Sequence, residues 1–392
     1  MNGSDQDGKQ TSAIQGAKAW RGRLRRALWR LLPLTVGLYV YIGWRLLPAL
    51  DLGGVGLALA VSGLAMSAVL VPFGLLARFV VRQDWADRLG WLGGIAMGFF
   101  SSVLVLTFLR DLLLLLLAPS LEKPTAIAVV VLAGLFTLLG YFNARRVARV
   151  VQVDIPVPNL PKELVGFTIV QISDLHVGPT IKRDYVQSVV DRVNELDADL
   201  VAITGDVVDG SVSALREHTE PLGSLKSRHG TYWVTGNHEY YSGAAAWIGE
   251  FERIGLRGLH NRHVVISHHG AHLVLAGVTD YLAGAFDSAQ ASDPAAALAG
   301  GPHGVPRILL AHQPRSAPAA EAAGFDLQIS GHTHGGQFWP WNHFVPLQQP
   351  FTAGLHRLGR LLVYTSRGTG YWGPPKRFGA PSEITRLRLV SA

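Results

Sequence analysis

Two different patterns of apolar and polar residues divide the chain. The first consists of long apolar runs with few charges, at residues 28–50, 54–81, 89–117 and 125–142. A helix needs about 20 mostly apolar residues to cross a bilayer, and each run approaches or exceeds that length. The pattern therefore predicts an all-α region of four transmembrane helices over residues 28–145, preceded by a disordered basic tail at residues 1–27.

The second pattern follows the apolar runs and has a shorter period. Phe167–Ser173 and Asp199–Thr204 have the length and the β-branched content of strands, whereas Arg183–Leu196 places its apolar residues on one side of a helix. Strands that alternate with helices predict an α/β domain, with functional groups beyond the carboxyl ends of the strands. We expect this domain at residues 165–392, after an extended, proline-containing connector at residues 146–164.

Charge refines the membrane prediction. The formal net charge is +7, and a basic cluster precedes the first apolar run, at Lys18, Arg21, Arg23, Arg25, Arg26 and Arg30. Beside a membrane segment such a cluster favours a topology and anionic-lipid anchor over nucleic-acid binding. Further basic flanks follow the second and fourth runs, which predicts a multi-pass protein of the inner (cytoplasmic) membrane with its catalytic domain in the cytoplasm. The chain has no cysteine, which excludes disulfides and thiolate metal sites.

One charged pair, Arg110-Asp111, interrupts the third apolar run. Such a pair has two interpretations. It can mark a helix end at the level of the lipid headgroups, or it can be a buried pair with a role inside a helix bundle. We favour the helix-end interpretation.

Candidate metal ligands follow the predicted strands. Asp174 and His176 come directly after the first one, and in an extended chain side chains two residues apart point the same way. The ends of four later strands carry similar groups, in Gly205-Asp206, Gly236-Asn237-His238, His312 and Gly331-His332-Thr333-His334. Carboxylate oxygen together with imidazole nitrogen suits Zn, Mn or Fe. A glycine before three of these groups allows backbone or ligand to approach closely.

The five motifs together resemble the calcineurin-like metallophosphoesterase superfamily over about residues 165–390. They are Asp-x-His, Gly-Asp-x-x-Asp, Gly-Asn-His-Glu, His and Gly-His-x-His, in this order. The resemblance implies a two-layer β-sandwich of mixed sheets, flanked by helices, with two divalent metal ions at its edge. It assigns one metal to Asp174, His176 and His334, the other to Asn237, His312 and His332, and the bridge between them to Asp206.

The resemblance also implies a catalytic pair. His238 would be no metal ligand but would stabilise the phosphoryl oxygens or protonate the leaving group, and Asp209 would orient it by a hydrogen bond. Two cations about 3.5–4 Å apart can clamp the attacking and leaving oxygens and acidify a shared water, so that hydroxide hydrolyses the ester. The ligand types are compatible with Mn, Fe, Zn or Mg-assisted activity.

The substrate class is a further hypothesis. Val170–His176, Gly331–Gln337 and Ser366–Gly370 are similar to a membrane-associated bacterial branch, which includes phosphodiesterase-like proteins and a UDP-2,3-diacylglucosamine pyrophosphatase of lipid A biosynthesis. The leading hypothesis is hydrolysis of a phosphodiester or pyrophosphate bond in a lipid-linked sugar nucleotide. One alternative is a membrane-anchored phosphodiesterase for soluble or cyclic nucleotides. Another is a non-catalytic membrane sensor or scaffold. We expect as partners a phosphate-containing substrate and the lipid bilayer, but no nucleic acid; the oligomeric state is open.

Three features near the motifs keep two interpretations each. Arg367 follows a predicted strand and could bind a substrate phosphate bidentately, or it could form a structural ion pair. The aromatic stretches Phe338–Val345 and Tyr371–Phe378 could line an apolar groove for an acyl chain, or they could pack as a lid over the site.

Overall fold

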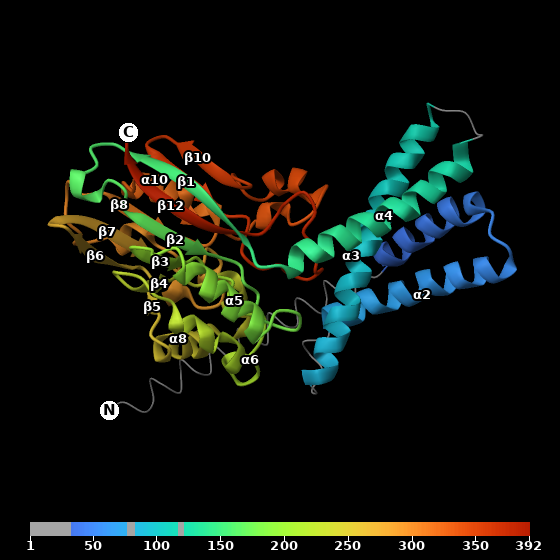
Figure 1. Cartoon of the computed structure of the whole chain (residues 1–392), viewed down its shortest axis with the longest axis horizontal. Helices are drawn as coiled ribbons and strands as arrows, with labels where there is room; N and C mark the ends of the chain where they lie inside the picture. Colours follow the sequence, from blue (N-terminus) through green and yellow to red (C-terminus); the bar gives the residue numbers. More distant parts are fainter. Residues whose placement is uncertain (1–32, 77–82, 117–120) are drawn as a thin grey trace. The chain divides into compact units, whose positions relative to one another are not determined.

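The computed structural model describes residues 33–76, 83–116 and 121–392, so the predicted tail at residues 1–27 lies outside the described part. The chain divides into two compact units (Figure 1). The described residues up to Arg145 and a short later segment, Gly373–Phe378, form a helical unit. Arg146–Trp372 and Gly379–Ala392 form the second unit, which contains all the predicted motifs.

The helical unit contains α2 (Gly54–Leu76), α3 (Gln83–Leu114) and α4 (Glu122–Arg145). Among the described residues, these three helices are long and apolar enough to cross a membrane. The predicted first span is described only from residue 33 and is helical from there to residue 50. The second, third and fourth predicted spans are therefore supported, and the first, at residues 28–50, stays a prediction.

The charged pair of α3 lies near the end of that helix and also connects helices. Asp111 accepts hydrogen bonds from Tyr41 Oη at 2.7 Å and from Arg45 Nε at 2.9 Å. Arg110 is 4% exposed and donates to the carbonyl oxygen of Glu122 at 3.0 Å. The structure therefore combines the two interpretations of the pair, because a position near the helix end still allows interhelical bonds.

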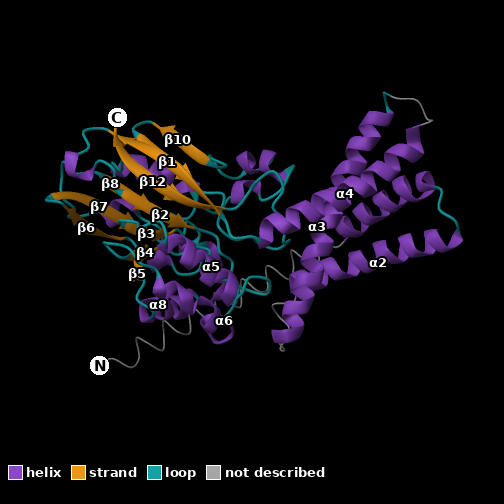
Figure 2. Cartoon of the chain, viewed as in Figure 1, coloured by secondary structure: helices purple, strands orange, loops and turns teal. Residues whose placement is uncertain are grey.

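The second unit contains two six-stranded mixed sheets (Figure 2). The first has the order β1 (Arg149–Val157), β12 (Glu383–Ser391), β2 (Thr168–Ile172), β3 (Leu200–Ile203), β4 (Thr231–Trp233) and β5 (Arg257–Gly258). Strands β2 to β5 are parallel, and β12 runs antiparallel to β2. The segment predicted to be an extended connector thus contains an edge strand, β1, paired in parallel with β12.

The second sheet has the order β10 (Gly354–Leu358), β11 (Leu361–Thr365), β9 (Leu327–Ser330), β8 (Arg307–Leu310), β7 (Ala271–Gly277) and β6 (Arg262–His268). Its four central strands are parallel, and an antiparallel strand closes each edge. Since the carboxyl ends of parallel strands lie at one edge of a sheet, the residues that follow β8 and β9 lie near each other.

One apolar core joins the two sheets. It includes Ile169 and Leu200 of the first sheet and Leu275 and Leu310 of the second, all fully buried. Full burial of a side chain of this size contributes about 1.5–3 kcal/mol, so this core fixes the sheets against each other. On the outer faces, α10 (Ala317–Ala323) packs on the second sheet, and Figure 1 shows α5 (Arg183–Asn194) and α8 (Ala244–Arg253) alongside strands of the first.

Candidate metal centre

The predicted ligands follow the ends of five strands, and several of the segments that carry them are hydrogen-bonded to one another. Asp174 N–H donates to Gly205 O at 3.0 Å, and His176 N–H donates to Asp206 O at 3.1 Å. In the other sheet, Gly331 N–H donates to His312 O at 2.9 Å. These backbone bonds extend the pairing of adjacent strands into the loops, so that Asp174 and His176 are held by the loop of Asp206 as well as by their own strand.

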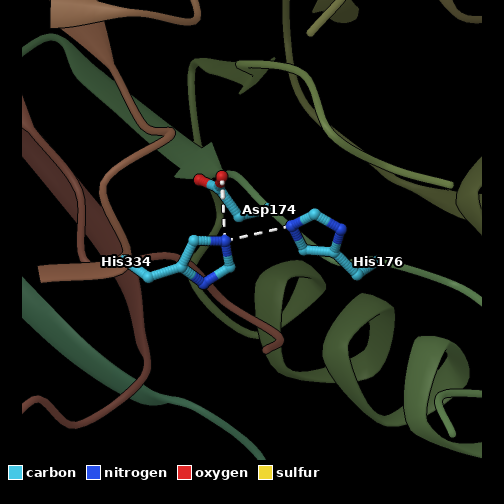
Figure 3. A group of neighbouring side chains, drawn as sticks. All are labelled: Asp174, His176 and His334. Carbon is cyan, nitrogen blue, oxygen red and sulfur yellow. Dashed lines mark hydrogen bonds and ion pairs between the residues drawn. The ribbon is translucent and has the colours of Figure 1, made fainter. Parts of the chain in front are cut away.

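Three of the predicted ligands form a first group, Asp174, His176 and His334 (Figure 3). The Nε2 atoms of His176 and His334 face each other at 3.0 Å, and His334 Nε2 lies 3.4 Å from Asp174 Oδ1. All three side chains are buried. Nitrogen and oxygen atoms that converge in this way can bind one cation.

A second group consists of Asp206, His312 and His332. His312 Nε2 lies 3.0 Å from Asp206 Oδ2 and 3.2 Å from His332 Nδ1. The other ring nitrogen of His312 donates to the carbonyl oxygen of Thr204 at 2.7 Å, which fixes the tautomer that leaves Nε2 free to coordinate. Asp206 also lies within 3.9 Å of His176 Nε2, so its carboxylate reaches both groups.

The backbone at these ligands is unusual. Asp174, His176, Asp206, His332 and His334 all have a positive φ, between 52° and 71°. Residues other than glycine adopt this left-handed conformation rarely and at a cost of about 1–3 kcal/mol each, mostly at functional sites. The extended geometry expected for the Asp-x-His motif is therefore wrong, although the two side chains do converge. Left-handed turns direct them to one point.

The glycines before the ligands allow the close approach that the sequence predicts. A Cβ atom on Gly236 would overlap with Asp206 Oδ1, and one on Gly331 would overlap with Ser173 Oγ and Asp174 Oδ2. No larger residue fits at these two positions without displacing a ligand.

Asn237 completes the set of predicted ligands. Its Oδ1 atom is buried and has no hydrogen-bond partner among the described residues. A buried carbonyl oxygen without a partner costs about 1–3 kcal/mol, and coordination of a cation would satisfy it. Together with the two groups of carboxylates and imidazoles, this oxygen makes the residues fit divalent cations.

His238 and Asp209 form the expected pair, and Asp209 has a second contact. His238 Nδ1 donates to Asp209 Oδ1, and His176 Nδ1 lies 3.2 Å from Asp209 Oδ2. One carboxylate thus orients both a predicted ligand and the predicted proton donor. Burial lowers the pKa of His238, but the charges of Asp206 and Asp209 outweigh burial and raise that pKa to about 9.

Glu239 is a further residue of this site, and the sequence analysis gave it no role. Its fully buried carboxylate accepts from the backbone N–H groups of Gly236 at 2.6 Å, Val207 at 2.8 Å and Asp206 at 3.0 Å. It therefore joins the loop of Asp206 to the start of α7 (Asn237–Ser242). A glutamate three residues after a helix N-cap is the signal that could have identified it.

Aromatic side chains flank the ring of His238. The centroid of the Tyr241 ring lies 5.1 Å away and that of Trp372 5.7 Å away. Gln337, three residues after the ligand His334, holds the backbone of Trp372 by two hydrogen bonds of 2.8 Å, one to its oxygen and one from its N–H. For Trp372, this packing supports the lid interpretation.

Arg367 forms an ion pair with Glu383, at 2.9 Å between Nη1 and Oε2. The structure therefore contains the ion pair, which was the alternative interpretation of Arg367. Arg367 is 37% exposed at its side chain, and phosphate binding by this residue stays a prediction.

Known proteins give an independent comparison. The family model for calcineurin-like phosphoesterase matches residues 167–336. A "Transmembrane protein with metallophosphoesterase domain" from Danio rerio is 40% identical over 69% of this chain and 63% of its own length, and its namesake from Bos taurus is 40% identical over 70% and 65%. An "Uncharacterized metallophosphoesterase" from Aquifex aeolicus is 33% identical over 62% of this chain and 91% of its own. The chain thus spans a little under two thirds of the two animal proteins.

Proposed function

Because the chain belongs to the calcineurin-like phosphoesterase family, we propose that it is a membrane-anchored phosphoesterase that uses two divalent metal ions to hydrolyse a phosphodiester or pyrophosphate bond. The observation that carries the proposal is the position of Asp206. Its Oδ2 atom lies 3.0 Å from His312 of one group and 3.9 Å from His176 of the other, which suits a carboxylate shared by two cations.

The proposed ligands follow the two groups. Asp174, His176 and His334 would hold one metal, and Asn237, His312 and His332 the other, with Asp206 shared. When bound, the metals would supply Lewis acidity, which acidifies a water and neutralises charge on the phosphoryl oxygens. In the metal-free protein burial opposes the ionisation of Asp206, but the charge of protonated His312 outweighs burial and holds the pKa of this carboxyl well below its usual value. Bound cations would favour the same anion once His312 coordinates as a neutral imidazole.

His238 acts on the leaving group in this proposal. Its Nδ1 proton is held by Asp209, so the second proton of the imidazolium lies on Nε2, which is 3.9 Å from Asp206 Oδ2. A water gives up one proton to the solvent and its oxygen bonds to phosphorus, the bond from phosphorus to the leaving oxygen breaks, and His238 Nε2 gives its proton to that leaving oxygen. The raised pKa keeps His238 protonated near neutral pH.

The substrate class is proposed more broadly than the chemistry. A catalytic domain anchored by apolar helices has access to lipid-linked substrates, and a lipid-linked sugar nucleotide such as UDP-2,3-diacylglucosamine is one candidate. Soluble and cyclic nucleotides are the alternative. The names of the three relatives above mention no substrate.

A substrate screen tests the proposed function. Full-length protein in detergent, loaded with Mn, is assayed with bis-nitrophenyl phosphate, a nucleotide panel and UDP-2,3-diacylglucosamine. We expect hydrolysis of at least one diester or pyrophosphate, lost in Asp206→Asn and kept in Asp191→Asn, whose carboxylate is exposed on α5. Metal-loaded protein that hydrolyses none of these substrates would contradict the proposal.

We also propose that the second unit, which we call the catalytic unit, faces the cytoplasm. The support is the positive charge before the first apolar run and after α4, where Arg145, Arg146 and Arg149 follow one another closely. A reporter that is active only in the cytoplasm should therefore be active when it is fused after Ala392. High alkaline phosphatase activity from such a fusion would show the opposite orientation.

A further inference from the structure

One short segment of the chain is packed with the helical unit although the residues before and after it are not. Gly373–Phe378 belongs to the helical unit, whereas the residues on both sides of it belong to the second unit. Within the helical unit, Arg377 N–H donates to the carbonyl oxygen of Gly140 at 2.8 Å. The ring of Phe378 stacks on Phe136 at 4.3 Å. The segment is thus bound to α4 by its backbone and by a side chain.

Lys376 lies at the centre of the segment and is 1% exposed. Its ammonium group donates to Gly98 O at 2.8 Å, to Ser102 Oγ at 2.5 Å and to Thr137 Oγ1 at 3.2 Å. These acceptors come from α3 and α4, two helices that are long and apolar enough to cross a membrane. An ammonium group among such helices is costly unless it is hydrogen-bonded, so the polar acceptors make a specific site for it.

Glycines make the space for the segment. A Cβ atom on Gly94 would lie 3.1 Å from Gly373 O, and one on Gly140 would lie 2.6 Å from Lys376 Cγ. We call Gly94, Gly98, Ser102, Thr137 and Gly140 the socket. An apolar pocket of about 350 Å³ lies beside it, lined in part by Gly134, where an added Cβ would meet open space.

The other end of the same stretch of chain is Trp372, which packs against His238 at 5.7 Å between ring centroids. Lys376 follows four residues later, and four residues of extended chain span at most about 14 Å. The position of Lys376 therefore restricts the positions that Trp372, which contacts the proposed proton donor, can adopt.

We propose that the socket positions Trp372: the binding of Lys376 between α3 and α4 holds the ring of Trp372 beside His238. Lys376 is then a positioning residue for the proposed hydrolysis, and the helical unit does more than anchor the enzyme. The inference rests on the proposed function for its kinetic readout. Its structural readout, hydrogen–deuterium exchange, is independent of the proposed function.

Two matched pairs of variants test the socket in full-length, metal-loaded protein. Lys376→Met keeps the aliphatic stem and removes the ammonium group, and Lys226→Met makes the same change at an exposed position. Gly140→Ala pushes on Lys376, whereas Gly134→Ala adds the same methyl group to α4 in open space. We expect the first member of each pair to lower kcat about tenfold, with KM and bound metal unchanged, and the second to behave as wild type.

A double-mutant cycle separates positioning from general destabilisation. If Lys376 acts through Trp372, then Lys376→Met should add nothing to the loss of kcat in Trp372→Ala. Hydrogen–deuterium exchange of the peptide over residues 366–380 should be faster in Lys376→Met than in Lys226→Met, with or without substrate. Multiplicative losses in the cycle, or unchanged exchange, would overturn the inference. If wild-type protein hydrolyses nothing, the proposed function fails, and the exchange experiment alone decides the socket.

Discussion

The two units bury polar groups in opposite ways. In the catalytic unit, buried carboxylates and imidazoles from different loops face one another, with nitrogens as close as 3.0 Å and a buried Asn237 oxygen that accepts nothing from the described residues. In the helical unit, Asp111 and Lys376 each meet complementary groups of neighbouring helices. The first arrangement leaves ligand capacity for cations, and the second joins helices. Burial of a polar group alone therefore does not indicate a site; the way its partners are satisfied does.

The largest effect is expected at the shared carboxylate. Asp206→Asn removes the charge that both groups share, so we expect both metals to bind more weakly and hydrolysis to fall about a thousandfold or more. Metal analysis and kcat/KM check this, with Asp191→Asn as the matched control. Two bound metals and normal turnover in Asp206→Asn would refute the shared-carboxylate assignment.

His238 should separate catalysis from metal binding. His238→Gln should retain the metals and lose turnover about a hundredfold or more, because the proton donor is gone. In the wild type, activity should fall as the pH rises through about 9, where His238 loses its proton. Asp209→Asn should move this fall to lower pH, because the charge of Asp209 raises the pKa of His238. An unchanged profile in His238→Gln, measured against the exposed His272→Gln, would assign the proton to another group.

Substitution of Glu239 should lower the stability of the fold and, through the ligand loops, the affinity for metal. Glu239→Gln replaces an acceptor of backbone N–H groups with an amide that is itself half donor. We expect unfolding of the metal-free protein to need about 1–3 kcal/mol less, and metal affinity to fall about 10–100-fold. The exposed Glu217→Gln is the control for thermal unfolding and metal titration. Equal stability of the two variants would show that the carboxylate is dispensable for the loops.

The smallest effect is expected in the helical unit. Asp111→Asn weakens the bonds from Tyr41 and Arg45, and interhelical bonds of this kind average about 0.6 kcal/mol. Asp51→Asn is the matched control, because Asp51 pairs with Lys123 at an exposed position. Unfolding in detergent mixtures should distinguish Asp111→Asn from wild type by a small shift and leave Asp51→Asn unchanged. A loss above about 3 kcal/mol for Asp111→Asn would show a fully buried pair instead.

Sequence patterns predicted the catalytic unit well because its signals are local. The strands around Ile169 and Leu309 are short apolar runs, and each predicted ligand lies within four residues of a strand end. Glycine spacing indicated close approach, and Gly236 and Gly331 confirm it. The positive φ angles could not be predicted, since an Asp-x-His sequence fits both an extended and a left-handed backbone.

Other features depend on contacts between residues far apart in sequence. The strand β1 pairs with β12, more than 200 residues later, so its sequence reads equally well as a connector. The second contact of Asp209 depends on the position of His176, 33 residues away. The glycines of α3 and α4 looked like ordinary residues of apolar helices until their partner, Gly373–Phe378, was located.

By itself, the sequence determined the apolar helices, the α/β character of the second unit and the identity of the groups at the strand ends. These properties follow from hydrophobic periodicity and from the chemistry of single side chains. Only the tertiary structure decided that Asp206 reaches both ligand groups, that Glu239 joins two loops and that Lys376 lies between α3 and α4. Such pairings depend on distances of a few ångströms between distant segments, and those distances are set by packing of the whole core.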